Sequence, residues 1–373
     1  MATNLRIPGP TPVPPSVMDA MRREMIPHRG PDFKTLYLDT LRMAREAHRT
    51  DGDVLTWPAS GSAGWEVAVV NLFSPGDPVL ATICGDFGER FSRVATIFGL
   101  DVRELVVPWG QAVTPELLRN ALARDPDVKG VFLTHNETST GVTNPLPELA
   151  AIVREHGALV VVDSVSGVGG LPLEMDAWGV DFVLSGSQKA WMCPPGLLIC
   201  AVGPRAWDAV ARSAFPTFYW DLTANRRLAA DGMTPTTPSL TLLYGFHTAL
   251  ERILDQGLEA VWDHHRRLGE FTRRGVTDLG LELFADPVYA SNTVTGIMLP
   301  IDHPAKAIVK AVRDKFGVEI GAGQGKMADA MLRIGHMGWC DEAALQDTLD
   351  AIGSVLRARG FVPTRATVMA STS

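Results

Sequence analysis

The sequence predicts an α/β protein in which helices cover both faces of a mostly parallel central sheet, followed by a smaller α+β domain. Short apolar runs bounded by turn residues alternate with segments of helical periodicity. The runs do not alternate apolar and polar residues, which is typical of strands buried on both faces. At roughly 150 residues per domain we expect two domains. We assign an extended arm to residues 1–15, a large domain to 16–255 and a small domain to 256–373.

The elements of the large domain follow one another in a regular order. The first fifteen residues are rich in proline, which disfavours helices and central strands, and a helical pattern begins at about Ser16. Thr114 and Pro115 are typical of a helix start, and Gly157 of a helix end. The predicted strands are residues 78–84, 102–107, 131–133, 158–162, 182–184 and 197–202, and the predicted helices are 65–72, 87–98, one that opens at 114, and 149–156.

The C-terminal part predicts the small domain. Residues 239–274 are helical with an apolar side, and this stretch could connect the two domains. After it we expect a strand at 293–299, a helix at 304–316, a glycine-rich turn at 321–325, a strand at 331–334 and a helix at 342–359.

The composition excludes several classes of protein. Lys and Arg number 34 against 42 Asp and Glu, a net charge of −8, which argues against binding to nucleic acid or acidic membranes. The four cysteines form no CxxC pair, so we expect buried free thiols and no metal site, with His264 and His265 on a solvated helix face. No apolar run reaches the ~20 residues that span a bilayer. We therefore expect a soluble cytoplasmic protein.

The residues directly after each predicted strand are the first candidates for a site, because ligands bind at the carboxyl ends of parallel strands. Lys189 follows the strand 182–184. A partly desolvated lysine there has a lowered pKa and can form a Schiff base, whereas a surface lysine on a turn is the alternative. Asp163 ends the apolar strand 158–162 and needs a cationic partner such as a protonated pyridine nitrogen. A structural cap on the next turn is the alternative for Asp163.

Two features between the first strands indicate contacts with a ligand. Ser60, Gly61 and Ser62 precede an apolar helix. Exposed backbone amides there could bind a phosphate, or the three residues could simply start the helix. Phe87 could stack on a planar cofactor, or its helical spacing to Phe91 could place it in the core.

Two further features lie later in the chain. The polar run 135–141, which contains Thr138, follows an apolar strand and could face the ligand cleft or form a solvated loop. Arg333 lies within the strand 331–334, where it could hold a substrate carboxylate or form an internal salt bridge.

The order of these motifs carries more information than any one of them. The sequence resembles the fold-type I enzymes that use pyridoxal 5′-phosphate, and in particular the class V aminotransferases of the alanine–glyoxylate and serine–glyoxylate (serine–pyruvate) group. The resemblance covers nearly the whole chain and rests on IPGPTPVPP, PHRGPDF, SGSAGWE, NLFSPGD, THNETSTGV, VVDSVSGVGG, SGSQKAWMCPPG and LRIGHMG.

The resemblance implies a role for each candidate residue. Lys189 would form the Schiff base with the cofactor and move the proton during the reaction, and Asp163 would pair with the pyridine nitrogen. The remaining implied contacts are Phe87 on the ring, Thr138 at its polar edge, Ser60, Gly61, Ser62 and Gln188 at the phosphate, and Arg333 at the substrate carboxylate.

The resemblance also implies a homodimer. Relatives carry a Tyr three residues before a Thr-Pro pair, and both reach the phosphate of the neighbouring subunit. Here the pair is Thr237-Pro238, and position 234 is Thr. Thr237 could instead lie near the N-cap of the following helix. The apolar face of 239–258 and the arm 7–15 have no obvious partner within one subunit, which agrees with a dimer.

The implied function is the transfer of an amino group from serine, alanine or a similar small amino acid to glyoxylate or pyruvate. A lyase or desulfurase of the same superfamily is one alternative. It would need a cysteine on a mobile loop, whereas Cys193 precedes Pro194-Pro195. A non-catalytic binding or hydrogenase-associated protein is the other alternative, against which the presence of both Lys189 and Asp163 argues.

Overall fold

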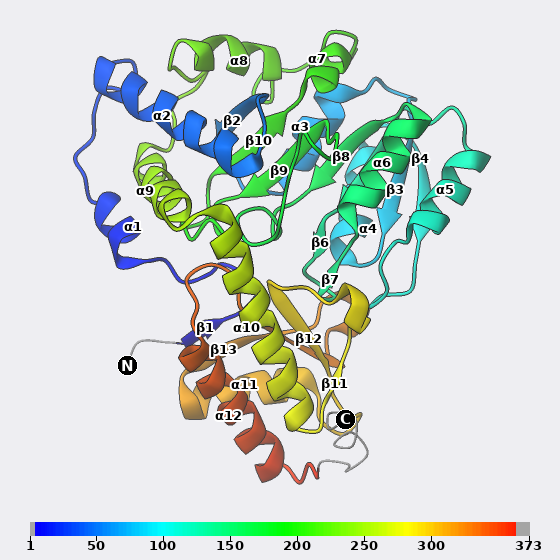
Figure 1. Ribbon diagram of the computed structural model, residues 1–373, viewed down its shortest axis with the longest axis vertical. Helices are drawn as coiled ribbons and strands as arrows, with labels where there is room; N and C mark the ends of the chain where they lie inside the picture. Colours follow the sequence, from blue (N-terminus) through cyan, green and yellow to red (C-terminus); the bar gives the residue numbers. More distant parts are fainter. Residues whose placement is uncertain (1–3, 363–373) are drawn as a thin grey trace.

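The computed structural model describes residues 4–362 and contains a seven-stranded sheet in a large domain and a five-stranded sheet in a small domain (Figure 1). The large sheet has the order β2-β10-β9-β8-β5-β3-β4. Its strands are parallel except β10, which pairs antiparallel with both neighbours. The mostly parallel sheet is thus confirmed. The strands are β2 Asp53–Trp57, β3 Pro78–Ile83, β4 Asp101–Val106, β5 Gly130–Thr134, β8 Leu159–Asp163, β9 Phe182–Gly186 and β10 Leu198–Val202.

Helices cover both faces of this sheet (Figure 1). α3 and α4 pack together behind it and α5 and α6 in front in this view. Two predicted helix ends are confirmed, because the Thr114 hydroxyl accepts the Leu117 amide at 3.3 Å and Gly157 ends α6 with a φ of 91°. The helices are α1 Pro15–Ala20, α2 Pro31–His48, α3 Ala63–Leu72, α4 Asp86–Ile97, α5 Pro115–Arg124, α6 Leu146–His156, α7 Pro204–Val210 and α8 Leu222–Ala230.

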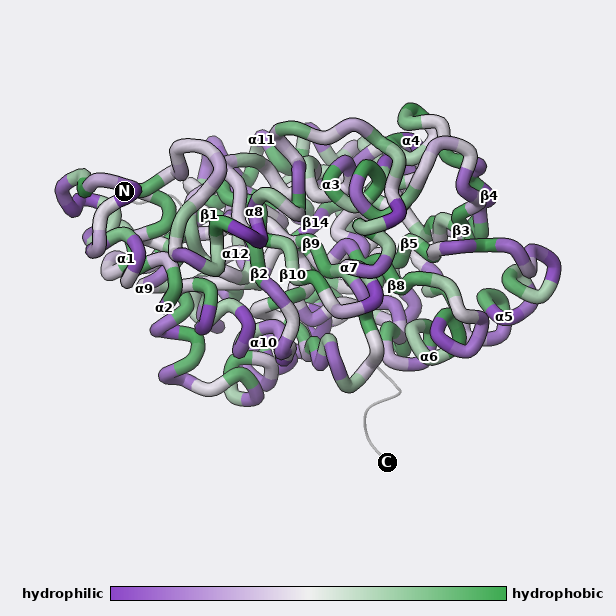
Figure 2. Tube along the Cα trace, turned by 90° about the horizontal axis from the view of Figure 1, so that it is seen from above, coloured by the Kyte–Doolittle hydropathy of each residue, from purple (hydrophilic) through white to green (hydrophobic). Residues whose placement is uncertain are grey.

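The central strands lie in the hydrophobic core. Every residue of β5, β8, β9 and β10 is buried, as expected for strands covered on both faces. Seen from above, hydrophilic residues gather toward the periphery, for example along α5 (Figure 2). No helix within residues 4–362 combines the length and the apolar character needed to cross a bilayer.

The helical stretch predicted over 239–274 forms two helices, α9 Leu240–Gln256 and α10 Leu258–Asp278. They are separated at Gly257, whose φ of 85° suits glycine. α9 packs against α1 and α2 of the same chain, so the expectation that its apolar face lacks a partner is wrong. α10 begins in the large-domain core and ends in the small-domain core. The domain boundary at 255/256 stays a prediction.

The N-terminal arm begins with a short strand that joins the sheet of the small domain. β1 (Asn4–Arg6) pairs parallel with β13 (Val318–Ala322) in a sheet of order β1-β13-β14-β12-β11. The first two residues of the predicted glycine-rich turn at 321–325 belong to β13, a strand that the sequence analysis missed. The other elements are β11 Glu282–Leu283, β12 Val294–Met298, α11 Ala305–Phe316, β14 Met331–Gly335, α12 Glu342–Ala358 and, in the large domain, the hairpin β6 Asn136–Glu137 with β7 Val142–Thr143.

Candidate active site

Three neighbouring strands end side by side at one edge of the large sheet. Thr134 of β5 is paired with Asp163 of β8, and Asp163 with Leu184 of β9. Backbone hydrogen bonds continue this alignment past the strands, from the His135 amide to the Asp163 carbonyl and from the Ser164 amide to the Leu184 carbonyl, at 2.9 and 3.0 Å. The polar residues that follow the three strands are therefore brought together.

Lys189 lies in the connection between β9 and β10, directly at this edge. The connection is closed by the Ser187 amide, which donates to the Leu197 carbonyl at 3.0 Å, and by the Ser187 hydroxyl, which donates to the Pro194 carbonyl at 2.6 Å. Burial and, to a smaller extent, the charge of Arg333 lower the pKa of Lys189, Asp163 opposes the change, and the result is a pKa of about 8. Lys189 is thus a largely desolvated amine, and the alternative of a surface lysine is wrong.

The N-terminal arm passes directly over this lysine. The Lys189 ammonium donates to the Pro8 carbonyl at 2.6 Å, and the Thr11 amide donates to the Gln188 carbonyl at 3.0 Å. A Cβ atom on Gly9 would lie 2.6 Å from Lys189 Nζ, and the φ of Gly9 is 123°, so only glycine suits this close approach. The arm therefore has a partner within its own subunit, contrary to the expectation from the sequence.

Asp163 is buried and accepts hydrogen bonds at both carboxylate oxygens. Oδ2 accepts the indole N–H of Trp65 at 2.7 Å, and Oδ1 accepts the Val165 amide at 2.9 Å. Burial raises the pKa of Asp163, and these hydrogen bonds and the charge of Lys189 oppose the increase. Oδ1 thus caps the turn that follows β8, which was the structural alternative for Asp163. The sequence analysis missed Trp65, although a Trp in a buried helix needs an acceptor for its N–H group.

A second buried carboxylate, Glu137, was also missed. Its oxygens accept the backbone amides of Phe87 and Gly88 at 3.1 Å and the hydroxyl of Ser139 at 2.6 Å. Burial raises the pKa of Glu137 to about 7, and the hydrogen bonds oppose the increase. Glu137 therefore caps the N-terminus of α4 and fixes the backbone of Phe87. The sequence signal that could have identified Glu137 is its position as an acidic residue in the polar run after β5.

The two aromatic residues of α4 have different surroundings. Phe91 is buried and stacks on Phe132 with ring centroids 4.2 Å apart, so Phe91 is the core residue. Phe87 is half-buried, with its ring centroid 6.5 Å from that of Trp65 and the guanidinium of Arg90 5.5 Å from its centroid. Phe91 thus belongs to the hydrophobic core, whereas Phe87 is only partly buried against it.

The start of α3 offers unpaired groups to an anion. Within residues 4–362, the amides of Gly61 and Ser62 donate no hydrogen bond, and the buried Gln188 Oε1 has no partner. A 180° rotation of the side-chain amide exchanges its oxygen and nitrogen, so Gln188 can also present an N–H group at this position. A Cβ on Gly61 would lie 2.8 Å from a Val165 methyl group, so the backbone packs closely here. These groups fit a phosphate at a helix N-terminus, beside the exposed Ser60.

Arg333 is held in place by neutral groups. Its guanidinium donates to the carbonyls of Ala322 and Thr138 at 2.9 and 3.1 Å and to Gln324 Oε1 at 2.9 Å. Burial lowers the pKa of Arg333 to about 10, and within residues 4–362 it forms no salt bridge. The alternative of an internal salt bridge is wrong, and the charge remains available to a substrate carboxylate.

Thr138 and its neighbours lie inside the molecule. The Thr138 hydroxyl forms a hydrogen bond with Ser166 Oγ at 2.7 Å. All seven residues of the run 135–141 are buried, so the alternative of a solvated loop is wrong. Residues of this run form β6 and the turn that connects it to β7.

The burial of His265 and of Cys340 differs from the sequence prediction. His265 is buried rather than solvated, because its ring contacts the Val261 carbonyl through Nδ1 at 2.7 Å and accepts the Gly338 amide at Nε2 at 2.9 Å. Burial lowers the pKa of His265 to about 4. Cys340 is only half-buried, whereas the other three thiols are buried and free as predicted.

The segment before α9 presents Thr237 to solvent. Thr237 is exposed and lies two residues before Ser239, the N-cap residue of α9, so it is near the helix start without being the cap itself. Thr234, where the resemblance implied a Tyr, is buried and donates to the Thr236 carbonyl at 2.7 Å.

The geometry predicts that Glu137→Gln lowers the free energy of unfolding by about 1–3 kcal/mol, because the new NH₂ group faces backbone amides that then lack an acceptor. The midpoint of urea unfolding measures this loss. Glu116→Gln, which changes an exposed glutamate in the first turn of α5, is the matched control. An equal midpoint for both variants would contradict the capping role of Glu137.

Comparison with known proteins identifies the family. The model of the family "Aminotransferase class-V" matches residues 3–340. "Soluble hydrogenase, small subunit" of Synechococcus sp. (strain PCC 6716) is 36% identical over 360 residues, which cover 96% of this chain and 94% of that protein. Serine–glyoxylate aminotransferase of Methylorubrum extorquens is 36% identical over 356 residues, covering 92% and 88%. The crystal structure of alanine–glyoxylate aminotransferase from Nostoc sp. superposes with a TM-score of 0.92 at 31% identity and covers 96% of both chains. The chain therefore belongs to the class V aminotransferase family and has the fold of the fold-type I enzymes that depend on pyridoxal 5′-phosphate.

Proposed function

We propose that this aminotransferase binds pyridoxal 5′-phosphate through Lys189 and moves an amino group from a small amino acid to glyoxylate or pyruvate. The observation that carries the proposal is the desolvated Lys189 amine, whose pKa is affected both by the buried carboxylate of Asp163 and by the guanidinium of Arg333, which forms no salt bridge within residues 4–362. Serine–glyoxylate aminotransferase and alanine–glyoxylate aminotransferase share glyoxylate in their names but differ in the amino acid that is named. The similarity therefore supports glyoxylate more strongly than any one donor.

The residues at the edge of the sheet fit the cofactor. The carboxylate of Asp163 would hold the ring nitrogen, and the Trp65 N–H group keeps that carboxylate oriented. The amides of Gly61 and Ser62 and the side chain of Gln188 would bind the phosphate. When bound, pyridoxal 5′-phosphate supplies an electron sink for the substrate carbanion.

Two further residues would contact the ring of the cofactor. Phe87 would cover one face, and its backbone is fixed by Glu137. Thr138 would approach the polar edge of the ring from the buried run 135–141.

Lys189 and Arg333 would act on the substrate. A lysine with a pKa of about 8 can take and return a proton near neutral pH. Arg333 would bind the substrate carboxylate through Nη2, the nitrogen that its three hydrogen bonds to neutral groups leave free. The arm at Pro8 and Gly9 lies against Lys189 and limits the access of water to the proton in transit.

The structure disfavours a desulfurase. Cys193 is buried, its Sγ donates to the Leu242 carbonyl at 3.8 Å, and burial raises the pKa of its thiol to about 12. A thiol in these surroundings is a poor nucleophile. One similar protein is named as a subunit of a soluble hydrogenase, so the alternative of a non-catalytic or hydrogenase-associated protein is tested by the activity assay below.

The function predicts that Lys189→Ala loses turnover and the absorbance band of the bound cofactor while the protein stays folded. Wild-type protein would be assayed with serine, alanine and other small amino acids as donors and with glyoxylate and pyruvate as acceptors. Borohydride should fix the cofactor to Lys189 in the wild type. A label on another lysine, or wild-type protein without any transamination in the screen, would contradict the proposal.

We also propose that the enzyme is a homodimer with shared sites. Thr237 is exposed in the single chain and does not cap a helix, which leaves its hydroxyl available to the phosphate of a neighbouring subunit. α1 and α2 cover α9, so the apolar face of that helix gives no support for a dimer.

A mixing experiment tests the shared site. Lys189→Ala and Thr237→Val chains would be unfolded together and refolded. Mixed dimers should contain one site with both intact Lys189 and intact Thr237, so the activity should exceed that of either parent. Separate refolding of each variant is the control, and mixed dimers without recovery, from two impaired parents, would refute sharing.

A further inference from the structure

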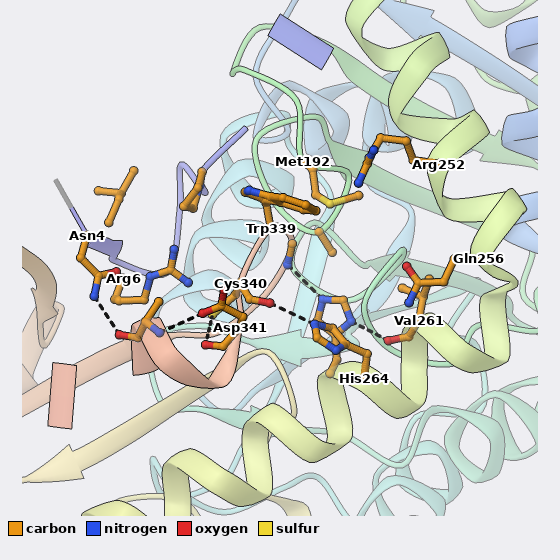
Figure 3. A pocket seen from close by; sticks show the side chains of 16 residues that line it. Asn4, Arg6, Met192, Arg252, Gln256, Val261, His264, Trp339, Cys340 and Asp341 are labelled. Carbon is orange, nitrogen blue, oxygen red and sulfur yellow. Dashed lines mark hydrogen bonds between the residues drawn. The ribbon is translucent and has the colours of Figure 1, made fainter. Parts of the chain in front are cut away.

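We propose that the protein has a second ligand site, for a small organic anion with an apolar body, in the pocket between the N-terminal arm, α9, α10 and the start of α12 (Figure 3). The cavity has a volume of about 460 Å³, enough for a small molecule. Its lining includes Arg6, Met192, Arg252, His264, Trp339 and Asp341. The proposal does not depend on the substrates of the active site.

Arg6 is the observation that points to an anion. Its side chain lies in β1 and is only 4% exposed, yet its Nε has no hydrogen-bond partner. Within residues 4–362 no carboxylate forms an ion pair with Arg6. Residues 1–3 and 363–373 contain no Asp or Glu. A buried guanidinium without a counter-ion is costly, and a bound anion would remove that cost.

The other charged groups of the pocket leave an excess of positive charge. Arg252 also has a buried Nε without a partner, and its Nη1 donates to Ser16 Oγ at 3.3 Å. Asp341 is the one carboxylate among the sixteen residues drawn in Figure 3, and its Oδ1 is engaged by the Ala344 amide at 2.8 Å. Asp341 thus caps the 17-residue helix α12, whose N-terminus adds partial positive charge.

The same pocket offers an apolar surface for the rest of the ligand. Trp339 is 46% exposed, and the guanidinium carbon of Arg252 lies 5.0 Å from its ring centroid. Figure 3 shows Arg6 and Arg252 on either side of the Trp339 ring in this view, with Met192 beside it. A flat or branched apolar body would lie against Trp339 while its charged group pairs with Arg6.

The pocket is separate from the active site but shares a wall with it. Ala190 and Met192, which follow Lys189 in the chain, line the pocket, whereas Lys189 does not. Gly338 closes this wall, since a Cβ there would lie 3.2 Å from Met192 Cγ and 3.3 Å from the Lys189 carbonyl. A ligand in the pocket would therefore lie behind the segment that carries Lys189.

Calorimetric titration of the cofactor-loaded protein with phenyl phosphate tests the proposal, with phenol as the neutral control. We expect saturable binding of phenyl phosphate and none of phenol. Binding should weaken at least about tenfold in Arg6→Gln, because the charged partner is lost. Arg22→Gln, which changes an exposed arginine paired with Asp19 on the surface, should bind as the wild type does.

Two further variants keep the test independent of how Arg6→Gln folds. Arg252→Gln and Trp339→Ala change less buried residues and should each weaken binding. Reduction of the cofactor-loaded wild type with borohydride, which keeps the phosphate groups of the active site occupied, should leave binding unchanged and so distinguishes this pocket from the active site. The titration contains no amino or oxo acid, so its outcome does not depend on the proposed reaction. No saturable binding of phenyl phosphate, or equal binding by wild type, Arg252→Gln and Trp339→Ala, would overturn the proposal.

Discussion

The site depends on one constraint, the placement of the Lys189 amine in a largely desolvated position. Burial makes the ammonium form costly, Arg333 increases that cost and Asp163 reduces it, and the result is a pKa of about 8. Each contribution needs a different part of the fold. β8 carries Asp163, the connection from β9 to β10 carries Lys189, and β14 of the small domain carries Arg333. The two domains must therefore meet for the lysine to acquire this pKa.

The N-terminal arm completes these surroundings. It begins as β1 in the small domain, passes over Lys189 at Gly9 and continues into α1 of the large domain. A short segment rich in proline thus connects both domains and covers the amine. The φ of 123° at Gly9 favours glycine on this path, and the absence of a side chain there lets the backbone lie close to Lys189 Nζ.

Local patterns predicted much of this arrangement, and contacts between distant segments account for what they missed. Apolar runs that end in Asp163 or precede Lys189 identify strand ends from neighbouring residues alone. The capping role of Glu137 on α4 joins residues about 50 positions apart, and the hydrogen bond of Trp65 to Asp163 spans 98 positions. His265 was expected in solvent because its helix carries many charges, but the Gly338 segment covers it. No periodicity in the sequence reveals such partners. The resemblance of the whole motif order to a known family supplied the roles that the individual motifs left open.

The central claim is that burial and the charge of Arg333 lower the pKa of Lys189 to about 8, so that an appreciable fraction of the amine is neutral near physiological pH. The most direct measurement is the rate of covalent attachment of pyridoxal 5′-phosphate to the apoenzyme as a function of pH, followed by absorbance without substrate. The rate should rise with a midpoint near pH 8, because only the neutral amine reacts. In Arg333→Gln the midpoint should move to higher pH, since a nearby positive charge no longer opposes protonation, whereas Arg22→Gln should leave it unchanged. A midpoint near the ordinary lysine value of 10.5 in the wild type, or the same midpoint in Arg333→Gln, would contradict the account.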